Sequence, residues 1–192
     1  MSDSKSIPGV ADNCAVCLYF DADTDAAVRR IWDAIAGAGI SDEMSAAGWR
    51  PHITLSGCRD LRLEEYLPAL RDFAARSEPL EIAFTSVGYF GGKAHHTLFL
   101  APTATGALLD LHERHHRLVF PLCASVSPYY APGGWVPHST LALSLSKEKL
   151  ARAVELIDIS TPITGTLEAV GMVRVARPRV QELGVLPIGH VP

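Results

Sequence analysis

Apolar positions recur along the chain with two spacings, one typical of strands and one typical of helices. Residues 14–20 (CAVCLYF) form a short apolar and aromatic run of the kind found in buried strands. The segment that follows places Val28, Ile31 and Ile35 at helical spacing, and Gly37 marks the end of this predicted helix. A strand followed by a helix is therefore the first predicted unit.

The rest of the pattern continues this alternation. Residues 80–90 alternate apolar and polar side chains, as a half-buried strand does, and residues 63–77 carry an amphipathic helical stripe. Further strands are predicted at 48–56, 96–101, 134–143, 163–175 and 179–188, and further helices at 103–120 and 146–158. Residues 121–134 are irregular and rich in Pro, Gly and Tyr, and residues 1–12 are expected to be flexible.

One eight-residue segment occurs twice. Residues 48–55 read GWRPHITL and residues 134–141 read GWVPHSTL, so six of the eight positions are identical. Each copy is followed by a polar turn, a helix, a long strand and a closing strand, and both long strands contain a Val-Gly step. This repeat predicts an internal duplication, with two similar units packed as lobes about a pseudo-two-fold axis.

The repeat also predicts a paired set of chemical groups. Within each copy the histidine and threonine are two residues apart on a strand, so both side chains project from the same face. The matching strands are expected to face each other across a cleft. His52 and Thr54 would then stand opposite His138 and Thr140.

Two imidazoles and two hydroxyls suit displacement at phosphorus. Such a reaction needs one proton removed from the nucleophile and one supplied to the leaving oxygen, and an imidazole can do either near neutral pH. The hydroxyls can donate hydrogen bonds to the non-bridging oxygens, where negative charge builds up. The pattern therefore indicates a metal-independent phosphoesterase that needs no cofactor.

The paired motifs at 52–55 and 138–141 resemble those of the two-histidine (2H) phosphoesterase superfamily, which includes the RNA 2′,3′-cyclic phosphodiesterases or 2′-5′ RNA ligase family. The resemblance covers roughly residues 14–186. It implies a single bilobal α+β domain over residues 1–192, with two antiparallel sheets flanked by outer helices around a central cleft. It also implies hydrolysis, or reverse ligation, of cyclic phosphates or 2′-5′ linkages.

Residue roles follow from the same resemblance. It implies that His52 and His138 are the catalytic acid and base, and that Thr54 and Thr140 bind the phosphate. Three aromatic residues, Trp49, Trp135 and Tyr89, are further candidates for substrate binding.

Each aromatic candidate has an alternative role. Trp49 and Trp135 either stack on a nucleobase or pack against their lobe. Tyr89, together with Tyr129 and Tyr130, is placed by the pattern near the mouth of the cleft.

Two other functions remain as alternatives. One is a non-catalytic module of the same fold that binds a nucleotide without hydrolysing it. The other is a zinc hydrolase, because residues 112–116 (HERHH) match the H-E-x-x-H motif on a predicted helix. The competing interpretation of these histidines, and of His95 and His96, is solvent-exposed surface. Cys14 and Cys17 are expected to be buried thiols, since they lie in a strand.

Charge and hydropathy restrict the partners. The formal net charge of −4, without a Lys/Arg cluster, argues against a long nucleic-acid duplex. A small phosphate ester, a cyclic nucleotide or a short RNA end needs only a few hydrogen-bond donors from the protein and is compatible with this charge. No apolar run reaches the roughly 20 residues that span a bilayer, so no membrane partner and a cytoplasmic location are expected. The sequence does not fix the oligomeric state, and a monomer is compatible with it.

Overall fold

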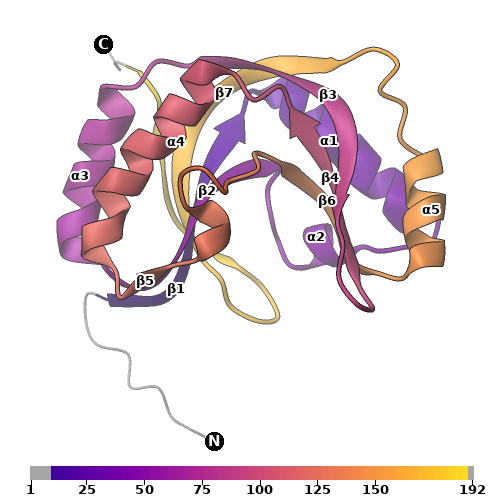
Figure 1. Cartoon of the computed structure of the whole chain (residues 1–192), viewed down its shortest axis with the longest axis horizontal. Coiled ribbons are helices and arrows are strands. Elements are labelled where there is room, and N and C mark those ends of the chain that lie inside the picture. Colours follow the sequence, from indigo (N-terminus) through magenta and orange to yellow (C-terminus); the bar gives the residue numbers. More distant parts are fainter. Residues whose placement is uncertain (1–9, 190–192) are drawn as a thin grey trace, which may run out of the picture.

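A computed structural model describes residues 10–189 as eight strands, five α-helices and two short 3₁₀ turns (Figure 1). The strands are β1 (Val10–Phe20), β2 (His52–Arg62), β3 (Leu80–Phe90), β4 (His96–Pro102), β5 (Ser125–Val126), β6 (Ser139–Leu145), β7 (Ile163–Arg174) and β8 (Gln181–Pro187). The helices are α1 (Ala22–Gly37), α2 (Glu43–Ala46), α3 (Leu63–Ala75), α4 (Gly106–Val119) and α5 (Lys147–Glu155), and the 3₁₀ turns span Phe120–Leu122 and Pro128–Tyr130. Of the residues expected to be flexible, 1–9 lie outside the described part, whereas β1 already begins at Val10.

The strands form one antiparallel sheet in the order β5-β2-β1-β7-β3-β4-β6, with β8 also paired to β7. The prediction of two separate sheets is therefore wrong. The physical reason is the length of β7: Ile163 to Leu167 pairs with β3, and Leu167 to Arg174 pairs with β1. A single strand thus carries main-chain hydrogen bonds from one half of the sheet to the other.

The strand order is symmetrical about the contact between β7 and β3. On one side the order is β7-β1-β2, and on the other it is β3-β4-β6. Each half of the sheet includes one long strand from the other half of the sequence, since β7 joins β1 and β2 while β3 joins β4 and β6. This arrangement agrees with the predicted duplication and shows that the two units exchange a strand.

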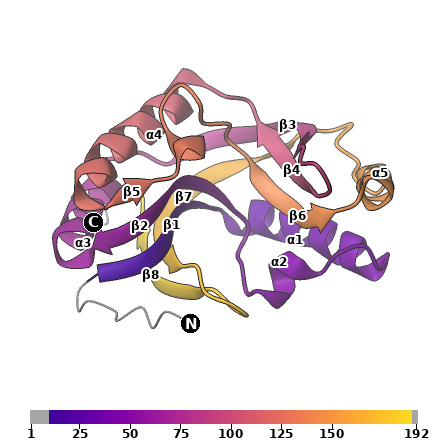
Figure 2. The same cartoon turned by 60° about the horizontal axis from the view of Figure 1, so that its bottom comes forward.

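Curvature of this sheet brings its far strands together. Four strands separate β2 from β6, so the two would lie about 24 Å apart in a flat sheet with a spacing of about 4.8 Å. Instead β2 and β6 contact each other, and Figure 2 shows the sheet curling between them. Figure 1 shows α3 and α4 at one end of the molecule and α1, α2 and α5 at the other.

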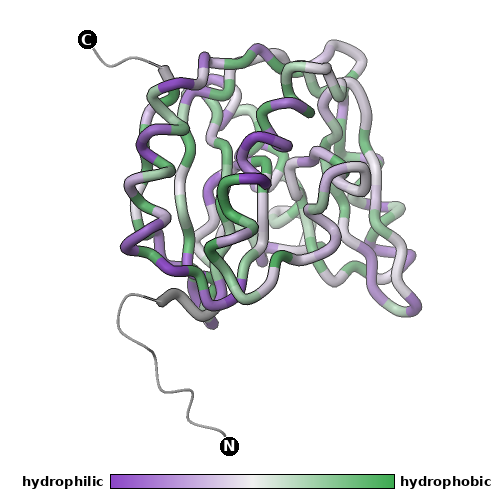
Figure 3. Tube along the Cα trace, turned by 60° about the vertical axis from the view of Figure 1, so that its left-hand side comes forward, coloured by the Kyte–Doolittle hydropathy of each residue, from purple (hydrophilic) through white to green (hydrophobic). Residues whose placement is uncertain are grey.

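The helices bury one stripe each against the sheet. In Figure 3, which brings the side with α3 and α4 forward, hydrophobic and hydrophilic positions alternate along the helices. Strand β1 is buried on both faces: Val16 and Leu18 join the main core, whereas Cys17 and Tyr19 join a smaller cluster on the opposite face. Cys14 and Cys17 are both buried, which confirms the prediction for these thiols.

The histidines of α4 contradict the prediction of a solvent-exposed face. His112 and His115 are buried, and His115 Nε2 lies 2.7 Å from the Tyr66 hydroxyl in the core. His96 on β4 is buried as well. The helix is amphipathic as predicted, but its inward stripe includes imidazoles because each buried ring has apolar carbon atoms that pack well.

Two indoles tie the motif strands to the other half of the molecule. Trp32 on α1 donates its Nε1 hydrogen to the main-chain carbonyl of Thr140, at 3.0 Å. Trp135 donates in the same way to the carbonyl of Thr54, also at 3.0 Å. Each tryptophan therefore holds the motif that belongs to the other half of the sequence.

None of the helices within residues 10–189 is long and apolar enough to cross a membrane.

We expect Trp32→Phe and Trp135→Phe each to lower the free energy of unfolding. Each change leaves a carbonyl of a motif threonine without its donor, which costs about 1–3 kcal/mol, and removes indole packing as well. Urea denaturation measures the effect. The control Val154→Ala, on the exposed side of α5, should stay within about 0.5 kcal/mol of the unchanged protein. An unchanged urea midpoint in both tryptophan variants would contradict this account.

Candidate functional site

The two motifs line one cavity of about 240 Å³, which we call the histidine cavity. His52 is the first residue of β2, and His138 directly precedes β6. Thr54 and Thr140 line the same cavity from these two strands. The structure thus brings together the four residues that the repeat singled out.

Both imidazoles are anchored in the same way. His52 Nδ1 lies 2.7 Å from the carbonyl oxygen of Arg50, and His138 Nδ1 lies 2.7 Å from the carbonyl oxygen of Val136. A carbonyl oxygen can only accept, so each Nδ1 donates and carries the ring proton of the neutral form. The lone pair of each neutral ring is therefore on Nε2, the atom suited to receive a proton.

Burial weakens the basicity of both rings. Burial, with a smaller contribution from nearby His138, lowers the pKa of His52 to about 4, although the hydrogen bond to Arg50 opposes the shift. Burial also lowers the pKa of His138, against the hydrogen bond to Val136. Removal from water disfavours the charged imidazolium, so both rings are mainly neutral near pH 7.

Aromatic rings hold each imidazole in place. Trp49 stacks on His52 with 4.8 Å between ring centroids and an angle of 25°. The ring centroids of Phe90 and Phe99 lie 4.9 Å and 5.2 Å from the ring centroid of His138. The repeat in the sequence indicates Trp49 but neither phenylalanine, because only the pairing of β4 with β6 brings Phe99 beside Thr140.

The repeated Val-Gly steps make room for two of the aromatic rings near the site. A Cβ on Gly88 would lie 2.6 Å from the Phe99 ring, and a Cβ on Gly171 would lie 2.4 Å from the Tyr19 ring. Phe99 contacts His138, and Tyr19 is the cross-strand partner of His52. Glycine is therefore required at matching places in the two halves of the sheet.

The remaining aromatic candidates lie in different surroundings. Trp135 is buried and stacks on His112 at 4.0 Å, outside the lining of the histidine cavity. Tyr89 is 57% exposed, contacts the edge of His96 and also lies outside that lining. Tyr130 does line the cavity, whereas Tyr129 is 81% exposed.

Tyr130 adds a phenol beside one motif threonine. Its ring packs over Gly57, where a Cβ would come within 3.2 Å. Burial raises the pKa of Tyr130, and a hydrogen bond with the Thr54 side chain opposes that rise. The phenol therefore stays protonated near neutral pH and supplies a further hydroxyl to the cavity.

The H-E-x-x-H segment has other partners in the fold. The two motif histidines are His112, whose Nε2 lies 3.0 Å from the carbonyl oxygen of Tyr130, and His116, whose ring centroid lies 5.4 Å from that of Phe120. His115, between them, meets the Tyr66 hydroxyl through Nε2. Within residues 10–189, no group of three or more His, Cys, Asp or Glu side chains is arranged to hold a metal ion. The segment therefore contributes to packing behind the site.

Solved structures with the same fold cover nearly the whole chain. TT0787 of Thermus thermophilus matches with a TM-score of 0.58 and 20% identity, over 93% of this chain and 100% of that one. E. coli LigT complexed with 3′-AMP matches with a TM-score of 0.58 and 16% identity, over 94% and 99%. A search with the sequence found no match among curated proteins. These low identities establish a common fold.

The sequence itself identifies the family. Residues 21–179 match the family described as the 2′-5′ RNA ligase superfamily. The matched region contains both His-x-Thr motifs and most of the sheet. On this evidence the chain belongs to the 2′-5′ RNA ligase superfamily, the group of two-histidine phosphoesterases.

Proposed function

We propose that the protein is a phosphoesterase that hydrolyses a cyclic phosphate or a 2′-5′ linkage, with His52 and His138 as general acid and base. The observation that carries this proposal is the matched anchoring of the two rings. Both Nδ1 atoms are held by a carbonyl two residues earlier, and both rings line one cavity. General acid/base catalysis needs two positioned groups of this kind.

In the proposed reaction, one neutral imidazole takes a proton from a water molecule through Nε2. The water oxygen forms a bond to phosphorus, and the bond between phosphorus and the leaving oxygen breaks. The other imidazole, protonated beforehand, gives its Nε2 proton to that leaving oxygen. The rings have then exchanged protonation states, and proton exchange with solvent restores them.

The hydroxyls and the buried surroundings support this chemistry. Thr54 and Thr140 donate to the non-bridging phosphate oxygens, whose charge grows in the transition state. Burial keeps the base neutral, while the negative charge of a bound phosphodiester raises the pKa of both rings and favours protonation of the acid. Substrate binding therefore creates the required pair of one neutral and one charged ring.

Relatives support the choice of ligand class. E. coli LigT has been crystallised with 3′-AMP, ATP and NADP⁺. A small phosphate ester, a cyclic nucleotide or a short RNA end is the corresponding substrate class for this chain. The proposed reaction uses no metal and no cofactor.

We expect His52→Ala and His138→Ala each to lower kcat by about 10²–10⁴-fold, since each removes one proton-transfer group. The assay follows hydrolysis of 2′,3′-cyclic nucleotides, ADP-ribose cyclic phosphate and 2′-5′ oligonucleotides, with EDTA present throughout. His95→Ala is the matched control, because His95 is an exposed histidine outside the cavity.

Circular dichroism should show that all three variants fold. Near-full activity in either cavity variant would rule out the two-histidine mechanism. Loss of activity on adding EDTA would instead favour a metal-dependent hydrolase.

The pH dependence of kcat/KM should be bell-shaped, with its maximum between about pH 4 and pH 6.5. The active free enzyme carries one proton on the pair, and burial lowers the pKa of His52 to about 4 and that of His138 below 6.5. Activity falls at lower pH because the base is protonated, and at higher pH because the acid loses its proton. The kcat profile should lie at higher pH, since bound phosphate raises both pKa values. Initial rates across a pH series measure both curves, and a kcat/KM maximum above pH 8 would contradict the assignment.

A further inference from the structure

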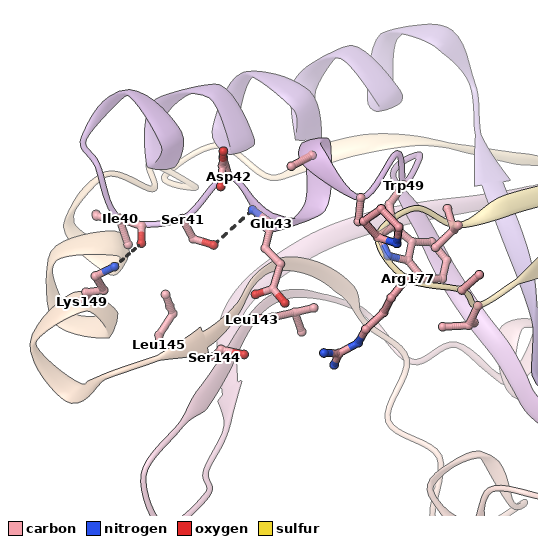
Figure 4. A pocket seen from close by; sticks show the side chains of 16 residues that line it. Ile40, Ser41, Asp42, Glu43, Trp49, Leu143, Ser144, Leu145, Lys149 and Arg177 are labelled. Atoms are coloured by element: carbon pink, nitrogen blue, oxygen red, sulfur yellow. Dashed lines mark hydrogen bonds between the residues drawn. The ribbon is translucent and has the colours of Figure 1, made fainter. Parts of the chain in front are cut away.

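A larger groove adjoins the histidine cavity. It has a volume of about 1030 Å³ and lies between the segment around α2, strand β6 and the segment from Val175 to Val180 (Figure 4). Trp49, Leu143 and Val175 line both this groove and the histidine cavity. A ligand can therefore extend from one space into the other, and we call the larger space the side groove.

The two volumes differ in what they can hold. The histidine cavity, about 240 Å³, is smaller than the roughly 300–1,000 Å³ of sites that enclose a whole small-molecule ligand. It suits the reacting phosphate and the atoms next to it. The side groove is about four times larger, so the rest of a bulky substrate has space there.

The side groove presents separate donors and acceptors. Figure 4 shows the side chains of Glu43 and Arg177 extending into the open space between α2 and β6. Among the described residues, neither forms an ion pair. Lys149, in contrast, donates from Nζ to the carbonyl oxygen of Ile40 at 2.8 Å, which links two residues that line the groove.

This combination fits a nucleoside better than a chain of phosphates. A carboxylate such as that of Glu43 accepts hydrogen bonds from ribose hydroxyls and base amino groups but repels phosphates. Trp49, at the junction of the two spaces, offers an aromatic surface to a base or sugar. Arg177 offers one guanidinium, which suits a single neighbouring phosphate.

We propose that the side groove binds the nucleoside next to the scissile phosphate, with Glu43 on its hydroxyl or amino groups and Arg177 on the following phosphate. This inference rests on the proposed function for the position of the reacting phosphate. It adds the direction in which the bound substrate extends out of the histidine cavity.

Calorimetric binding of two probes tests the proposal: inorganic phosphate, and a 2′-5′-linked adenosine trinucleotide with phosphorothioate linkages that slow cleavage. Ala46→Trp fills the side groove from α2, since Ala46 lines the groove but not the histidine cavity. We expect it to weaken trinucleotide binding by about tenfold or more, the effect of losing one good contact region, and to leave phosphate binding unchanged. Ala107→Trp, at an exposed position on α4, is the matched control.

A second pair of variants tests Arg177 without adding bulk. Arg177→Ala should weaken trinucleotide binding about fivefold to tenfold, whereas Arg179→Ala, two residues away and outside the lining, should not. Unchanged trinucleotide affinity in both Ala46→Trp and Arg177→Ala would overturn the proposal. Equal loss of both probes in Ala46→Trp would also overturn it, because the groove would then not be a separate subsite.

These results are independent of the test of catalysis. Suppose His52→Ala and His138→Ala kept full activity while Ala46→Trp still weakened the binding of the trinucleotide alone. The assignment of the groove would then be supported and the two-histidine mechanism would be ruled out. If the histidine variants were inactive and the groove variants bound both probes normally, the mechanism would be supported and the assignment of the groove would be ruled out.

Discussion

The pairing of β7 with both halves of the sheet is the constraint on which the site depends. The first residues of β7 pair with β3 and its later residues pair with β1, so the two duplicated units share one hydrogen-bonded sheet. The motif strands β2 and β6 lie on opposite sides of β7, with β1 between β7 and β2, and β3 and β4 between β7 and β6. Twist and curvature accumulated over those strands bring the motifs into contact, and the indoles of Trp32 and Trp135 hold them there.

Burial of the two imidazoles has a chemical consequence. A ring withdrawn from water beside aromatic neighbours loses hydration, which disfavours its charged form. The carbonyl bonded to each Nδ1 limits this cost and leaves the lone pair of the neutral ring on Nε2. The protein thus holds two weakly basic rings in one cavity, each with its Nδ1 bonded to a main-chain carbonyl.

The histidines of α4 show that a chemical motif in a sequence can have a packing role. His112 stacks under Trp135, and Trp135 donates to the main chain of Thr54. Its neighbour His115 meets the Tyr66 hydroxyl in the core. The zinc-like spacing belongs to His112 and His116, yet His112 Nε2 is directed to the carbonyl of Tyr130 and the His116 ring packs 5.4 Å from that of Phe120. They support the wall of the histidine cavity from behind.

The sequence alone indicated the family, the duplication and the shared face of each histidine and its threonine, because a strand places residues two apart on one face wherever the strand lies. It also located nearly every element, since hydrophobic spacing is a local property. Only the tertiary structure decided that the sheet is single, that Phe90 and Phe99 flank His138, and that Trp135 packs behind the cavity. These features depend on which strands pair and how far the sheet curls, and both are set by contacts between residues far apart in the chain.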